Sequence, residues 1–114
     1  MIDYDKMEEY GFDKKDAIRR FLNNQALFEK CIKKYWNSSD YDNLLNAAVK
    51  GDYAELLKYA HTLKGASGVL SLVPLHEAYT KMVDCLRKGD NSEAMKCLPK
   101  IKEYESAYRS AYIS

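Results

Sequence analysis

The chain has 114 residues and a formal net charge of +1, from 18 basic and 17 acidic residues. This length suffices for one domain with a hydrophobic core, but not for two lobes around a large enzyme active site. The balanced charge provides no strong field for nucleic acid or for an anionic membrane surface. We therefore expect a single domain over residues 1–114 that binds neither.

The sequence shows no signal for export or membrane insertion. Residues 1–5 are acidic and lack an apolar segment, and no run approaches the roughly 18 apolar residues of a membrane span. The three cysteines, Cys31, Cys85 and Cys97, are widely separated beside apolar residues, as is typical of reduced thiols. These features predict a cytoplasmic protein.

Apolar residues recur at spacings of three and four along most of the chain, and signals for strands are nearly absent. The first predicted element is a short helix over residues 3–10 that ends at Gly11. A second helix begins at Asp13 or Asp16 and runs to about Asn23. The N-terminal part therefore contributes short helices.

Asn24 is placed to cap the next segment, which the polar residues 37–40 interrupt. This segment is either one long kinked helix or two helices with a short break. It closes at Gly51–Asp52, and the same pair of residue types recurs at Gly89–Asp90. Both pairs predict reversals between antiparallel helices.

The second half of the chain predicts three further helices. The first runs from residue 53 to about Ser71, the second starts at Pro74, and the last spans about 91–113 with a kink at Pro99. Because short turns make neighbouring helices antiparallel, the predicted fold is all-α. We expect an antiparallel up-and-down four-helix bundle with additional short N-terminal helices packed across it.

The helix that carries His61 has a core side and a nearly bare side. Opposite the histidine lie Leu56, Tyr59, Leu63, Ala66 and Leu70. The histidine side holds Ala54, Leu57, Lys58, Lys64, Gly65 and Gly68. A glycine within a helix costs about 1 kcal/mol relative to alanine. We expect Gly65 and Gly68 to face solvent and to leave clearance for a partner or a phosphoryl group at the imidazole.

Histidine offers a ring nitrogen that can attack phosphorus at neutral pH, and Lys64, one turn after His61, can screen the charge of a phosphoryl group. Lys58, three residues before His61, could assist this screening or merely increase solubility, and we favour the second role. His76 has no comparable neighbours, so we expect an ordinary surface histidine. A metal site of His61 and His76 is discounted, because neither has a flanking cysteine or a paired carboxylate.

The segment His61-Thr62-Leu63-Lys64-Gly65, followed by Ala66-Ser67-Gly68, resembles the signature of histidine-containing phosphotransfer (HPt) domains of two-component phosphorelays. The order of segments over roughly residues 12–110 is also similar. The resemblance implies a carrier that accepts a phosphoryl group on Nε2 of His61 and passes it to a receiver aspartate. It implies that Lys64 stabilises the phosphate and that Gly65 leaves room for it.

The resemblance also implies the partners. These are the receiver domain of a response regulator and a hybrid sensor histidine kinase, and the receiver would supply Mg²⁺, so that this chain needs no cofactor or metal of its own. We expect docking at Ala54, Leu57 and Lys58, together with Lys64, Gly65, Gly68 and part of the N-terminal helices. One presented histidine requires no dimer, so we expect a monomer.

Two positions depart from the family pattern. Ser71 stands where members usually have glycine, ten residues after the histidine. Val83 stands where many members have Glu or Gln to hold the other imidazole nitrogen, a role that Asp84 or Arg87 could take over. These departures concern the end of the helix and the orientation of the ring.

Two other functions compete with that of a phosphorelay carrier. A helical adaptor that binds receiver domains without phosphotransfer is the alternative, and retention of His61 and Lys64 argues against it. A self-contained enzyme is not expected, because the sequence has no P-loop, no glycine-rich nucleotide motif after a strand and no carboxylate cluster for a metal.

Overall fold

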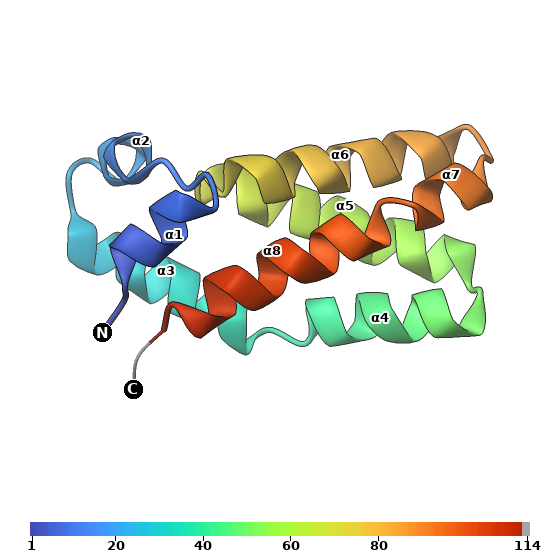
Figure 1. Cartoon of the computed structure of the whole chain (residues 1–114), viewed down its shortest axis with the longest axis horizontal. Coiled ribbons are helices and arrows are strands. Elements are labelled where there is room, and N and C mark those ends of the chain that lie inside the picture. The colour runs from blue at the N-terminus through green and yellow to red at the C-terminus, as the bar shows by residue number, and fades with distance from the viewer. Residues whose placement is uncertain (113–114) are drawn as a thin grey trace.

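A computed structural model describes residues 1–112, and in that range the chain forms eight α-helices and no strand (Figure 1). The all-α prediction is confirmed. The helices are α1 (Tyr4–Glu9), α2 (Lys14–Arg20), α3 (Gln25–Asn37), α4 (Asp40–Lys50), α5 (Tyr53–Val69), α6 (Val73–Arg87), α7 (Asn91–Met95) and α8 (Leu98–Ser110).

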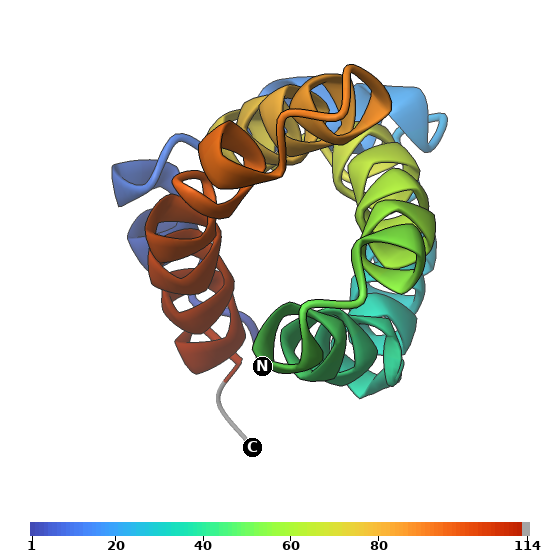
Figure 2. The same cartoon turned by 90° about the vertical axis from the view of Figure 1, so that its right-hand side faces the viewer.

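The long helices form the expected antiparallel bundle. Helix α5 packs against α4 on one side and α6 on the other, and α6 packs against α7 and α8. Helices α3 and α4 follow one another along one edge, so that the helices surround a common interior (Figure 2). The short helices lie outside: α1 packs against α8, and α2 packs against α3 and lies across one end of the bundle (Figure 1).

Five helices begin at an aspartate or asparagine whose side chain accepts a hydrogen bond from the amide three residues on. These residues are Asp3, Asp13, Asn24, Asp52 and Asp90. Asp13 and not Asp16 therefore caps α2. Helix α2 ends at Arg20, before the expected residue 23, because Leu22 and Asn23 adopt φ angles of 55° and 60°.

Two helices with a short break, and not one kinked helix, occupy the middle of the chain. Ser38 is extended, with φ −71° and ψ 147°, and ends α3. Its hydroxyl then accepts a hydrogen bond of 3.1 Å from the amide of Asp40, at the start of α4. A serine that serves the next helix in this way competes with continued helix.

Both predicted glycine reversals are confirmed, with φ angles of 66° at Gly51 and 77° at Gly89. The single kinked helix expected over 91–113 is wrong within the described residues, since α7 ends at Met95 and α8 starts at Leu98. Pro99 lies in the first turn of α8, where no intrahelical partner is needed for an amide. In a continuous helix, the proline ring would collide with the carbonyl of Met95. Residue 113 lies outside the described residues.

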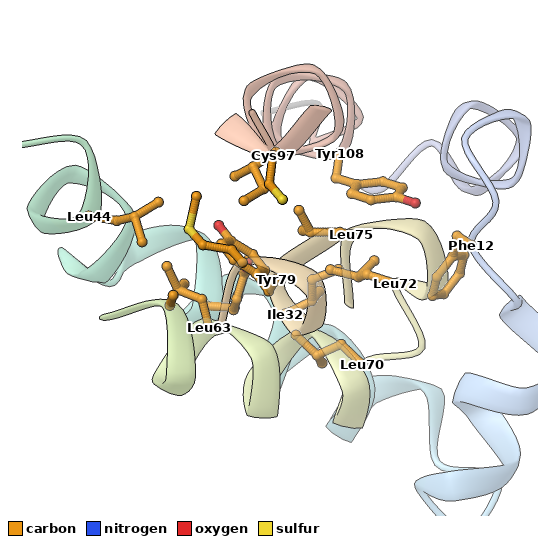
Figure 3. Packing of buried hydrophobic residues seen from close by; sticks show 14 of the residues in the cluster. Phe12, Ile32, Leu44, Leu63, Leu70, Leu72, Leu75, Tyr79, Cys97 and Tyr108 are labelled. Carbon is orange, nitrogen blue, oxygen red and sulfur yellow. The ribbon is translucent and has the colours of Figure 1, made fainter. Parts of the chain in front are cut away.

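The buried apolar residues form one cluster to which the long helices and the N-terminal segment contribute. Leu63, Tyr79 and Tyr108, from α5, α6 and α8, belong to it, and Phe12 joins it from the α1–α2 loop (Figure 3). Burial of this surface is the main stabilising contribution to the bundle. Within the described residues the cysteines are free thiols, with Cys97 buried and the other two half-buried.

One carboxylate is enclosed in this core. Glu105 of α8 is fully buried, and its Oε2 accepts hydrogen bonds of 2.7 Å from the Tyr35 hydroxyl and 2.5 Å from the Tyr79 hydroxyl. Arg109 lies 3.4 Å from the other oxygen. The Glu105 network therefore joins α3, α6 and α8 through paired polar groups.

Candidate functional site

The two faces of α5 lie as the sequence predicts. Leu56, Leu63 and Leu70 are buried, whereas His61 and Gly65 are exposed. The buried side is wider than expected toward α6, because Ala60 and Ser67 are also fully buried. The exposed strip that carries the histidine is therefore narrow, and α6 borders it on one side.

His61 and Lys64 are available for a ligand. Over residues 1–112, neither side chain takes part in a hydrogen bond or an ion pair with another part of the chain. Lys64 is half-buried, and its backbone carbonyl is bonded to the Ser67 hydroxyl and to the ring of His76. One helical turn separates the two residues, so the ammonium can reach an anion held on the imidazole.

The three residues expected on the docking surface all lie on the accessible side of α5. Ala54 and Lys58 are exposed, and Leu57 is half-buried against the core. The Lys58 ammonium lies 5.1 Å from the centre of the neighbouring Tyr59 ring, within the range of a cation–π contact.

The two glycines differ. A Cβ atom built on Gly65 meets nothing within 4 Å, so the space over this residue is open, as expected. A Cβ built on Gly68 would lie 2.9 Å from Nδ1 of His76. The expectation that packing does not involve Gly68 is therefore wrong: the glycine makes room for a side chain of α6.

The expectation that His76 is an ordinary surface histidine is also wrong. It is half-buried, and its Nδ1 lies 2.8 Å from the carbonyl oxygen of Lys64. Because a carbonyl can only accept, Nδ1 must carry the hydrogen of this bond. The supposed surface histidine thus contacts the backbone of the His61–Gly65 segment.

The two departures from the family pattern have different outcomes. Ser71 adopts φ 58°, the left-handed conformation that glycine favours, and its hydroxyl donates a 2.9 Å hydrogen bond to Asp16. Val83 is fully buried, and neither Asp84 nor Arg87 bonds the imidazole. In the described part of the chain, the backbone conformation is thus retained at position 71, but no group orients the His61 ring.

Two depressions flank the C-terminal half of α5, and Gly65 lines both. The first lies between α3 and α5 and is largely apolar, with Phe21, Cys31, Tyr35, Leu63 and Val69 among its walls. The second is more polar and includes Asp16, Arg20, Gly68 and His76. Open apolar surface therefore begins beside the exposed histidine.

Asp16 carries the strongest local charge interactions near this end of α5. Its carboxylate lies 2.5 Å from Arg19 and 2.7 Å from Arg20. Hydrogen bonds from Arg19, then Ser71 and then Arg20 lower the pKa of Asp16 to about 2. Because the single carboxylate of Asp16 pairs with both arginines, it offsets only one of their two positive charges, and a net positive charge remains at this end of α5.

Comparison with known proteins identifies the family. The model of the Hpt domain family matches residues 36–111, more than half of the chain. The chain belongs to the Hpt family. Hpt domains act in histidine phosphotransfer in phosphorelays, as carriers that interact with receiver domains and kinases. Helices α1 and α2 and nearly all of α3 lie before the matched range.

No curated protein and no solved structure gave a significant match to this Hpt domain. In the part of the chain that the structure describes, no helix has both the length and the apolar character needed to cross a bilayer. Nor do residues 1–112 contain a group of three or more His, Cys, Asp or Glu side chains that could hold a metal ion.

The sequence did contain a signal for the missed contact. The turn between α5 and α6 is centred on Ser71, and Lys64 lies seven residues before it and His76 five residues after it. Counting outward from the turn therefore places the two residues at similar levels of the Hpt bundle. The sequence contains no such signal for the apolar depression. Phe21 and Cys31 line it, and their position beside α5 depends on how α2 and α3 pack.

Proposed function

We propose that this Hpt domain carries a phosphoryl group on Nε2 of His61 between receiver domains. The observation that carries the proposal is the exposed imidazole of His61, one turn from half-buried Lys64 and beside the open space over Gly65, with neither side chain bonded elsewhere within residues 1–112. A structural histidine would have a hydrogen-bond partner or buried surface.

In the proposed step, the lone pair of Nε2 attacks the phosphorus of a receiver aspartyl phosphate. The N–P bond forms as the P–O bond breaks, and the aspartate leaves as a carboxylate with the bonding electron pair. Nδ1 keeps its hydrogen, so the phosphorylated ring is cationic and partly offsets the phosphoryl charge. Lys64 screens the charge that spreads over the phosphoryl oxygens. The receiver would supply Mg²⁺.

The partner surface is proposed to extend from Ala54, Leu57 and Lys58 past His61 to the apolar depression between α3 and α5. Exposed apolar area beside charged residues is typical of a small, transient interface. Val69 adds to it, with 57% of its surface exposed at the wall of the depression. The family's receiver domains and hybrid kinases are the proposed partners.

The decisive experiment is transfer of label from a phosphorylated receiver domain to the wild-type chain and to His61→Gln. We expect acid-labile, base-stable label on the wild type alone. His76 remains in the variant, so loss of label assigns the phosphoryl group to His61. Binding of receivers without label, with the fold confirmed by circular dichroism, would instead support the phosphotransfer-inactive adaptor.

A further inference from the structure

We propose that His76 is a positioning residue for the His61–Lys64 site, and that it holds the last turns of α5 in place through the carbonyl of Lys64. This inference rests on the proposed function. His76 touches neither the imidazole nor a phosphoryl group, and so it would act on the reaction only through Lys64.

The contact is specific on both sides. The ring of His76 donates from Nδ1 to the Lys64 carbonyl at 2.8 Å, and the same carbonyl accepts the Ser67 hydroxyl at 3.1 Å. The ring also fills the space that Gly68 leaves, since a Cβ there would approach Nδ1 and Cε1 to about 3.0 Å or less. Any residue other than glycine at position 68 would displace the ring.

The segment that His76 holds has little helical stability of its own. Gly65 and Gly68 both lie in its short length, each about 1 kcal/mol less favourable than alanine, and α5 ends at Val69. The amides of residues 70–72 bond the carbonyls of residues 66–68 and close the end of the helix, but these bonds lie beyond Lys64. The bond from α6 to Lys64 therefore holds α5 at the start of its glycine-containing last turns.

The consequence for the site is that the backbone of Lys64 is held by a neighbouring helix, whereas the imidazole of His61 is not held. Val83 is buried, and across residues 1–112 no side chain bonds the His61 ring. The backbone of Lys64 is bonded to the neighbouring helix, and its ammonium has no partner among the residues that the structure describes. Fraying from residue 64 onward would move the ammonium away from a phosphoryl group on His61.

The test is a double-mutant cycle in which the rate of phosphoryl transfer is measured. A phosphorylated receiver domain is the donor, and the temperature is one at which every variant is folded. The variants are His76→Ala, Lys64→Ala and the double variant, with Glu77→Ala as the control at the next, exposed position of α6. We expect His76→Ala to be about fivefold slower than wild type, the factor that corresponds to one hydrogen bond of about 1 kcal/mol. In the Lys64→Ala background, loss of His76 should change nothing further.

Two outcomes would overturn the inference: transfer by His76→Ala at the wild-type rate, or an equal loss with and without Lys64. Failure of the wild type to accept label would count against the proposed function instead. Amide hydrogen exchange then still tests whether the His76–Lys64 bond holds the end of α5. His76→Ala should accelerate exchange over residues 64–70, and Glu77→Ala should not. Unchanged exchange in that segment would directly contradict a role of this bond in holding the helix.

Discussion

The hydroxyl of Ser71 donates a hydrogen bond of 2.9 Å to Oδ2 of Asp16, and this bond ties the end of α5 to α2. Ser71 is buried and adopts a φ angle of 58°. Position 71 therefore combines an unfavourable backbone conformation with a polar contact that compensates for it. The junction between the bundle and its N-terminal helices depends on this pair.

Replacement of Ser71 should separate these two contributions. Ser71→Ala keeps the left-handed backbone and loses the bond, so we expect the free energy of unfolding to fall by about 1–2 kcal/mol. Ser71→Gly also loses the bond but relieves the backbone, and should cost at least about 0.5 kcal/mol less than the alanine variant. Urea unfolding measures both, and equal losses would show that the backbone conformation is not strained.

The lowered pKa of Asp16 predicts an acid-sensitive contribution to stability. The pKa is about 2 in the folded chain, against an ordinary value of 3.8. The stabilisation is therefore complete above about pH 4 and is lost as the pH falls through about 2. We expect the melting temperature of the wild type to exceed that of Asp16→Asn at neutral pH, and the difference to shrink over that acid range. A difference that does not depend on pH would exclude the carboxylate as its source.

The Glu105 network predicts a large loss of stability when its carboxylate is removed. Glu105→Leu leaves the hydroxyls of Tyr35 and Tyr79 without their buried acceptor, and we expect about 3–5 kcal/mol of destabilisation in urea unfolding. Tyr79→Phe removes one bond and should cost only about 1 kcal/mol. Because Tyr35 also lines the apolar depression proposed for the partner, Glu105→Leu tests stability alone. Tyr79 lines neither depression beside α5, so Tyr79→Phe, folded at low temperature, should transfer label at the wild-type rate.

The same network predicts sensitivity to alkali. Burial first, and then the Glu105 charge, raise the pKa of Tyr35 and of Tyr79 well above the ordinary value of 10.0. Folding therefore favours the neutral phenols, and this contribution is present below about pH 10 and lost as the pH rises further. We expect the two phenols to ionise, by tyrosinate absorbance, only as the chain unfolds. Their titration in the folded chain near pH 10 would contradict the raised values.

The two glycines of the site should respond oppositely to alanine. Gly65→Ala adds a Cβ in open space, so we expect up to about 1 kcal/mol of stabilisation from helix propensity, together with slower phosphoryl transfer if the space serves the partner. Gly68→Ala should destabilise, because the new Cβ meets His76. In the His76→Ala background, the same change should become stabilising, and thermal unfolding of the four variants tests this reversal of sign.

Most of the fold could be predicted because its signals are local. Aspartate or asparagine side chains cap five helices, and Gly51 and Gly89 take the positive φ angles that end helices. The polar residues 37–40 do not decide between one kinked helix and two, and the sequence over 91–113 does not reveal the break between α7 and α8. Apolar periodicity alone does not locate the residue at which a helix stops.

The sequence by itself determined the all-α class, the helix that carries His61, and the exposed side of that helix, because periodicity and helix ends depend on neighbouring residues. Tertiary structure alone decided which helix borders that side and what fills the space at Gly68. The ring of His76, the hydroxyl of Ser71 and the carboxylate of Glu105 find partners 12, 55 and 70 residues away. Such pairings depend on the register and rotation of packed helices, which residue spacing within one helix does not specify.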